Sequence, residues 1–169
     1  ETMSFEIQSE RITAVPGGSE LLVQLINLSL DAPTESDFLS SALDLVRKTV
    51  KSKGVVFVRG VKGQWRVIAN SGSGDSLPVE LLAETLDSEK CQQSDGWTAA
   101  PLFRPNSSGK LIACDSSIDP EVFDGLTAAV GLALTALERR FQHRRRAARL
   151  EAILEMTVHW NQSRETDQL

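Results

Sequence analysis

The side chains of this sequence best suited to metal binding or redox chemistry are two cysteines and two histidines, namely Cys91, Cys114, His143 and His159. Neither pair has the close spacing of a metal site, and the cysteines do not make a disulfide framework. Both histidines fall near the C-terminal end, where we expect exposed or helix-seam residues rather than ligands. We therefore predict no metal and no cofactor, and the cysteine usage favours a reducing, cytoplasmic environment.

A run of arginines near the C-terminal end raises the hypothesis of a nucleic-acid contact. It comprises Arg139, Arg140, Arg144, Arg145, Arg146 and Arg149. However, the net charge is -5, the sequence pI is near 5.1, and no aromatic interleaving or reading motif accompanies the run. We interpret it as the solvated flank of a helix, paired with Glu138 or Glu151, and predict no direct nucleic-acid binding by this segment.

Length and composition indicate one compact domain with additional helix. The chain has 169 residues, of which 41% are hydrophobic and 24% charged, so it can bury a core without staples. No apolar run approaches the roughly 20 residues of a membrane span, and no signal-peptide pattern opens the chain, so we predict no membrane attachment. The chain starts at Glu1 and stops within a helical pattern at Leu169, so we expect a piece of a larger protein.

Two helices are predicted in the first third of the chain. Ser19 is positioned to cap a helix that Pro33 stops. Thr34 followed by Asp37 resembles a capping box, and the apolar stripe after it has the spacing of a core-facing helix. Gly54 is expected to end that helix as a left-handed cap.

Strand-like runs then alternate with turns. Residues 55–58 and 65–69 predict a hairpin, residues 78–86 a short helix, and residues 97–103 and 110–114 a second strand pair with a turn near Pro105. Strand pairs joined by short turns imply an antiparallel sheet with helices packed on it. The predicted class is α+β.

A final helix is predicted to begin at Asp119 and Pro120 and to run to about Trp160. A helix this long exceeds what one small domain can bury, so its distal part is expected to pair with a second copy. Apolar residues of the terminal helices are the candidate dimer contacts. They are Leu22, Leu25, Ile26, Leu137, Phe141, Leu150, Ile153 and Trp160.

Several segments together resemble GAF domains, over roughly residues 34–140. The string Ala99-Ala100-Pro101-Leu102, followed by a turn and by residues 109–116 (GKLIACDS), resembles the family's closing hairpin. Residues 67–72 (VIANSG) resemble its second strand, and residues 123–137 its C-terminal helix. PAS domains are a fold-level rival, but their strand-first order fits less well.

The resemblance implies an antiparallel sheet with helices on one face and a small-molecule pocket on the other. The candidate lining residues are Phe57, Arg66, Ile68, Leu82, Trp97 and Ala99. It further implies a module that dimerises through terminal helices and sits before an output domain in the same chain, such as a two-component histidine kinase or an ATPase-type transcription activator. The expected division is a linker over 1–18, a sensor domain over 19–141 and a connector helix over 142–169.

The chemistry of individual GAF subclasses is not matched here. The motif of cyclic-nucleotide binders is absent, and neither cysteine is followed by the histidine typical of bilin attachment. The domain body has no histidine for haem. Free methionine sulfoxide reductases would need Cys91 as the reactive thiol and Cys114 to resolve it, but their cysteine loop is missing, so we predict that the chain is not an enzyme.

The segment between Leu86 and Trp97 is much shorter than the lid of ligand-binding GAF domains. We expect a shallow groove rather than a closed cavity. The leading hypothesis is a sensory and dimerisation module that couples ligand occupancy or dimer packing to an output domain. The alternative is a connector without a ligand that only sets dimer geometry.

Overall fold

The computed structural model describes residues 18–73, 76–103 and 108–166. Two helices open the described chain: α2 covers Gly18–Asp31 and α3 covers Glu35–Val50. Five strands follow, with a short helix after the second, and a long helix ends the chain. The predicted linker over 1–18 lies outside the described residues apart from Gly18, where α2 begins.

The start of α3 confirms the predicted cap at Thr34. The Thr34 hydroxyl oxygen accepts a hydrogen bond from the Asp37 backbone N–H at 3.1 Å, and the hydroxyl donates to the Asp37 carboxylate at 2.6 Å. The predicted cap at Gly54 is wrong. Lys51 takes the left-handed conformation that ends α3, with a φ of 52°, and its N–H donates to carbonyls of the last helical turn. Gly54 instead begins the first strand.

The sheet is antiparallel and has the strand order β2-β1-β5-β4-β3. Its strands are β1 (Gly54–Val61), β2 (Gln64–Gly72), β3 (Gln92–Ser94), β4 (Trp97–Pro101) and β5 (Lys110–Cys114). β1 lies between β2 and β5 and pairs with both. β3 was not predicted, because its three polar residues carry no apolar alternation. The turn predicted at Pro105 lies outside the described residues.

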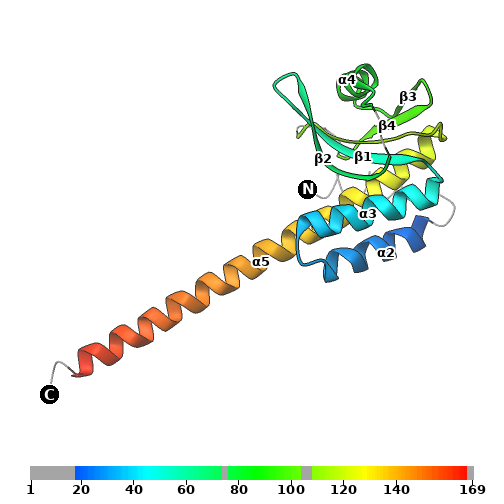
Figure 1. Cartoon of the computed structure of the whole chain (residues 1–169). Helices are drawn as coiled ribbons and strands as arrows, with labels where there is room; N and C mark the ends of the chain where they lie inside the picture. Colours follow the sequence, from blue (N-terminus) through cyan, green and yellow to red (C-terminus); the bar gives the residue numbers. More distant parts are fainter. Residues whose placement is uncertain (1–17, 74–75, 104–107, 167–169) are drawn as a thin grey trace.

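The two faces of the sheet are covered differently (Figure 1). Helices α3 and α5 pack on one face, and α2 packs against both of them to complete a three-helix layer. Phe57 of β1 and Ile112 of β5 join the larger core on this side. Helix α4 (Val79–Ser88) covers the other face, where Val56 and Val58 join the smaller core. The alternation along β1 therefore sends odd-numbered residues to the three-helix layer and even-numbered residues to α4.

Helix α5 extends over Pro120–Thr166 and is 47 residues long. Asp119 caps its start, since its carboxylate accepts hydrogen bonds from the backbone N–H groups of Glu121 at 2.9 Å and Val122 at 3.3 Å. The first half packs along α2 and under the sheet, and the second half projects away from the domain (Figure 1).

One stretch of α5 is long and apolar enough to cross a membrane by composition alone. However, 67% of that stretch is buried inside the fold, which explains its apolar composition, because the core-facing helix of a packed domain has the same character.

Candidate functional site

The face of the sheet under α4 is where the resemblance led us to expect a ligand. Leu81 and Leu82 of α4 pack directly on β4 and β5, and Ala99 and Leu111 are buried beneath them. Trp65, Leu77, Leu86 and Trp97 close the rim of this small core. Side chains of the domain itself thus occupy the centre of this face.

The six candidate lining residues do not converge on one site. Leu82, Ala99 and Trp97 lie together in the small core. The prediction for Phe57 is wrong, because its odd position in β1 buries it in the opposite, three-helix layer. Arg66 and Ile68 are exposed on edge strand β2, where Ile68 is left unpaired by a bulge opposite Phe57 and Val58.

The segment between α4 and Trp97 forms a tight edge hairpin instead of a long lid. β3 pairs with β4 through a turn at Asp95 and Gly96, which both have positive φ values. A polar hollow of about 310 Å³ lies beside this turn, lined by Pro78, Val79, Glu80, Leu81, Ser94 and Asp95. The short segment accordingly leaves a small surface hollow at the start of α4.

The two cysteines are poorly arranged for thiol–disulfide chemistry. Cys114 is buried at the end of β5, and burial raises the pKa of its thiol to about 12, which suppresses the reactive thiolate. Cys91 is half-buried just before β3. β4 lies between β3 and β5, which separates these strands by about 9–10 Å. A disulfide needs Cα atoms within about 7 Å, so the pair cannot close without movement of the backbone.

Among the residues that the structure describes, no group of three or more His, Cys, Asp or Glu side chains is placed to hold a metal ion. His143 and His159 lie on the exposed part of α5, as predicted.

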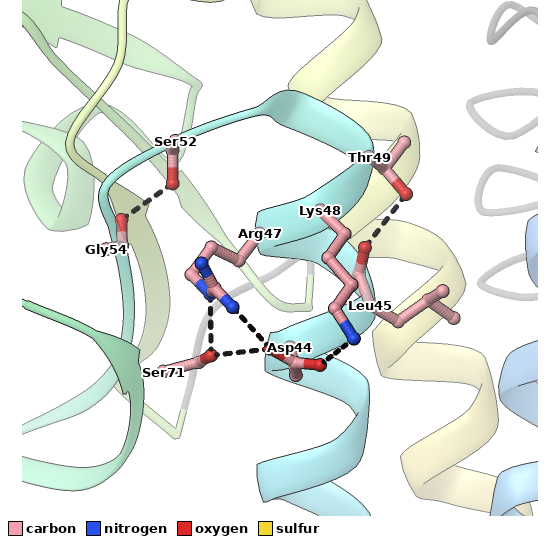
Figure 2. Close-up of polar contacts among 8 residues, drawn as sticks. All are labelled: Asp44, Leu45, Arg47, Lys48, Thr49, Ser52, Gly54 and Ser71. Atoms are coloured by element: carbon pink, nitrogen blue, oxygen red, sulfur yellow. Dashed lines mark hydrogen bonds and ion pairs between the residues drawn. The ribbon is translucent and has the colours of Figure 1, made fainter.

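A polar network that the sequence did not predict joins α3 to the end of β2 (Figure 2). Arg47 donates to the Ser71 hydroxyl at 3.0 Å and to the Asp44 carboxylate at 2.7 Å, and Lys48 approaches the same carboxylate at 2.6 Å. The hydrogen bonds from Lys48 and Arg47 lower the pKa of Asp44 to about 2. Asp44 and Lys48 also border a hollow of about 460 Å³ between α2 and α3.

An apolar groove lies between α2 and α5. It has a volume of about 450 Å³ and is lined by Leu22, Ile26, Leu132, Thr135, Ala136, Arg139, Arg140 and His143. Val23 and Leu30 of α2 are exposed large apolar residues of the same helix. Unpaired apolar surface of this kind on a helix pair is typical of an interaction site.

The outer face of α5 continues this groove in a regular register. Leu132, Ala136, Arg139 and His143 line the groove, and the alternating four- and three-residue steps continue through Arg146. The same steps then reach Leu150, Ile153, Thr157 and Trp160. We call these nine residues the α5 seam. Its period of 3.5 residues is that of a left-handed coiled coil.

The structure contradicts some of the predicted dimer contacts that lie within the domain. Leu25 and Leu137 are completely buried in the core of their own chain, so they are unavailable to a second copy. Phe141 is half-buried against the same core and lies under the Arg140 guanidinium, 5.0 Å from the ring centroid. Leu132 and Ala136, which the sequence analysis did not single out, line the surface groove, and the alternating steps counted back from Leu150 lead to both.

The distal part of α5 keeps its predicted contacts exposed. Leu150, Ile153 and Trp160 are 62%, 52% and 73% exposed. Leu154 and Met156 are exposed beside the seam, at positions that flank the core of a coiled coil. Leu22 and Ile26 line the groove at the other end of this surface.

Comparison with known proteins supports a fold rather than an activity. No protein-family model matches the sequence, and no curated protein matches it significantly. Solved structures match with a probability of 1.00 but at low sequence identity.

Three of these structures illustrate the similarity. The GAF domain of the Escherichia coli potassium sensor histidine kinase is 11% identical with a TM-score of 0.55, covering 74% of this chain and 98% of its own. The GAF domain of an Acinetobacter phosphoenolpyruvate-protein phosphotransferase is 9% identical with a TM-score of 0.54, covering 71% and 93%. The free methionine-R-sulfoxide reductase of Neisseria meningitidis is 12% identical with a TM-score of 0.57, covering 72% and 90%. With its 2-1-5-4-3 antiparallel sheet, its three-helix layer and its long terminal helix, this chain has the α+β fold of GAF domains.

Proposed function

We propose that this chain is a regulatory GAF-type module of a larger, cytoplasmic signalling protein, and that it acts as a homodimer through α2 and α5. The observation that carries the proposal is the continuity of α5. One unbroken helix passes from the domain core into an exposed segment whose apolar residues keep a coiled-coil register. Such a helix can transmit a change in domain packing to whatever follows it in the chain.

The energetic reason for pairing lies in the exposed apolar residues of the α5 seam. Leu150, Ile153 and Trp160 have no apolar cover within the described chain. Burying a large apolar side chain stabilises by about 1.5–3 kcal/mol, so three per chain supply a substantial driving force. A second copy would supply the same residues in the same register, which is the arrangement of a parallel coiled coil.

The proposed output is a domain in the same chain, such as a histidine kinase or an ATPase-type transcription activator. The GAF-fold neighbours of this chain include a domain of a sensor histidine kinase. A change in the packing of the domains would shift the relative populations of two helix arrangements, and any ligand would act through its differential affinity for the two states.

Self-association is tested by sedimentation equilibrium on the 169-residue chain and on Leu150→Glu/Ile153→Glu. We expect a dimer for the natural chain and a loss of affinity of about 100-fold or more for the variant, because two charges per chain would enter the seam. Ala148→Glu/Ala152→Glu adds the same charge away from the seam and should remain dimeric. A natural chain that stays monomeric at about 100 μM would refute the proposal.

A second candidate function is a connector without a ligand, which the filled face under α4 favours. Leu81 and Leu82 occupy the place where a GAF ligand was expected. A thermal-shift screen against nucleotides, amino acids and small organic acids separates the two functions. A reproducible, concentration-dependent rise in Tm would exclude the connector, and Leu82→Ala should then alter that response without abolishing dimerisation.

A further inference from the structure

The middle of the α5 seam is basic, in contrast to both of its ends. Arg139, His143 and Arg146 occupy three successive seam positions between Ala136 and Leu150. Arg139 and His143 line the groove beside α2, and Arg146 is exposed one step further along the helix. We call these three residues the basic seam layers.

No acidic residue of the helix neutralises these layers. The chain has no Asp or Glu between Glu138 and Glu151, and both of those positions lie off the seam. Glu138 is directed to Lys110 of β5, at 3.7 Å. The positions that flank the seam here are held by Arg140, Gln142, Ala147 and Arg149, so a second copy would bring no carboxylate either.

Arg140 has a different role from Arg139. Its guanidinium donates to the backbone carbonyl of Ala32, directly after the end of α2. It thereby satisfies a carbonyl at the C-terminal end of that helix, where cations are favoured. Arg140 is therefore committed to the fold, whereas Arg139 and Arg146 extend along the exposed side of α5.

Pairing two copies in register brings the basic seam layers of both chains together. Arg139 and Arg146 are seven residues apart, which is about 10 Å along a helix. Four guanidinium groups and two imidazoles would then lie within a distance close to the Debye length of about 8 Å at physiological ionic strength. Like charges this close repel. The two α5 helices therefore pair weakly at the basic seam layers unless an anion binds between them.

Resting on the proposed function, we propose that the basic seam layers form a binding site for a soluble anion with several phosphate groups, which joins the two α5 helices of the dimer. Arginine suits this ligand, because its planar guanidinium donates two parallel hydrogen bonds to phosphate oxygens. The site exists only between two copies. Anion binding and tight pairing therefore strengthen each other.

The location of these residues argues for a small soluble anion rather than a polyanionic surface. A bilayer or a nucleic-acid duplex reaches the outward residues Arg144 and Arg145 but not a layer between two helices. A soluble anion bound between the helices would therefore require Arg139 and Arg146, whereas a membrane or nucleic-acid surface would require Arg144 and Arg145.

The test is the dimer Kd of the 169-residue chain by sedimentation equilibrium, with and without sodium tripolyphosphate at constant ionic strength. We expect tripolyphosphate to lower the Kd by about tenfold or more. Arg139→Gln/Arg146→Gln should dimerise more tightly than the natural chain without the anion and should lose the response. Arg144→Gln/Arg145→Gln removes the same charge off the seam and should keep it. Circular dichroism verifies that both variants retain α5.

Several outcomes overturn this site. A dimer whose Kd is insensitive to tripolyphosphate refutes it while leaving the proposed function intact. A response that is lost in Arg144→Gln/Arg145→Gln but kept in Arg139→Gln/Arg146→Gln places anion binding on the outer surface and also refutes it. Phosphatidylserine vesicles or duplex DNA that tighten the dimer through Arg144 and Arg145 would identify a surface contact instead. A chain that is monomeric under every condition refutes the dimer itself.

Discussion

Arg47 of α3 donates a hydrogen bond of 3.0 Å to the hydroxyl of Ser71, the second-last residue of β2, while also holding the Asp44 carboxylate (Figure 2). Ser71 donates in turn to Asp44 at 3.3 Å. The three residues close a ring of hydrogen bonds between a helix of the three-helix layer and an edge strand. This ring ties the β1–β2 hairpin to the layer that carries α5.

The lowered pKa of Asp44 predicts an acid-dependent contribution to stability. The folded pKa is about 2 against an ordinary value of 3.8, so the unfolded chain binds the proton more readily. This contribution is present above about pH 4 and is lost as the pH falls through about 2. Urea denaturation between pH 2 and 7 should therefore show a smaller acid-induced loss for Asp44→Asn than for the natural chain. The side chain is 36% exposed, so solvent moderates the effect. Lys48→Met, which removes the main cause of the shift, should reduce the difference; an unchanged difference contradicts the assignment.

Gly72 at the end of β2 is predicted to be irreplaceable for steric reasons. Its φ is 82°, and a Cβ atom there would lie 2.2 Å from the Lys53 carbonyl oxygen and 2.9 Å from Cδ of Arg47. Gly72→Ala should lower the free energy of unfolding by about 2–5 kcal/mol, since backbone strain adds to the clash. Gly63→Ala is the matched control, because its φ of 78° is similar but no atom lies within 4 Å of the added Cβ. It should cost about 1 kcal/mol. Equal costs in chemical denaturation would disprove the clash.

Truncation of Leu137 and truncation of Leu150, both in α5, should affect different properties of the protein. Leu137 is fully buried in the domain core, so Leu137→Ala is expected to lower the free energy of unfolding by about 2–5 kcal/mol. Leu150→Ala should leave the unfolding of the domain nearly unchanged and should weaken dimerisation. The pair is compared by urea denaturation at low concentration and by sedimentation equilibrium. A domain destabilised equally by both changes would contradict the division of α5 into a core part and a pairing part.

The cysteines should differ in their reaction with a thiol reagent. Burial raises the pKa of Cys114 to about 12, whereas Cys91 is half-buried near the edge of the sheet. In the native chain at pH 8, we expect one thiol to react rapidly with Ellman's reagent and the second only on unfolding. Cys91→Ser should remove the rapid phase and Cys114→Ser should retain it. Two thiols that react at the same rate in the folded protein would refute this arrangement.

Local sequence signals were sufficient to predict many of the helices and strands. Thr34 and Asp37 predicted the start of α3, and Asp119 with Pro120 predicted the start of α5, because capping depends on residues a few positions apart. The strands at 55–58, 65–69 and 110–114 followed from short β-branched runs and appear in the structure with longer bounds for the first two. By contrast, the polar strand β3 forms only because β4 offers it a paired edge.

The residues of the candidate ligand site were harder to predict from the sequence than the helices and strands. Of the six predicted lining residues, Phe57 lies on the opposite face, and Arg66 and Ile68 lie on an edge strand. The bulge opposite Phe57 and Val58 shifts the register of β2, and no local pattern reveals such a shift. The network of Asp44, Arg47 and Ser71 likewise depends on a contact between α3 and Ser71, which lies 24 residues after Arg47 in the chain.

The sequence alone determined the α+β class, the element order and a terminal helix too long for its domain, since helix caps, strand periodicity and turn residues act over short distances. Tertiary structure decided which side of α5 belongs to the core. Leu137 has the apolar character of a seam residue, yet packing in the core of its own chain turns it inward, whereas Ala136 and Arg139 line the surface groove. A helix 47 residues long has apolar residues on more than one side, and only its neighbours determine which of them is buried.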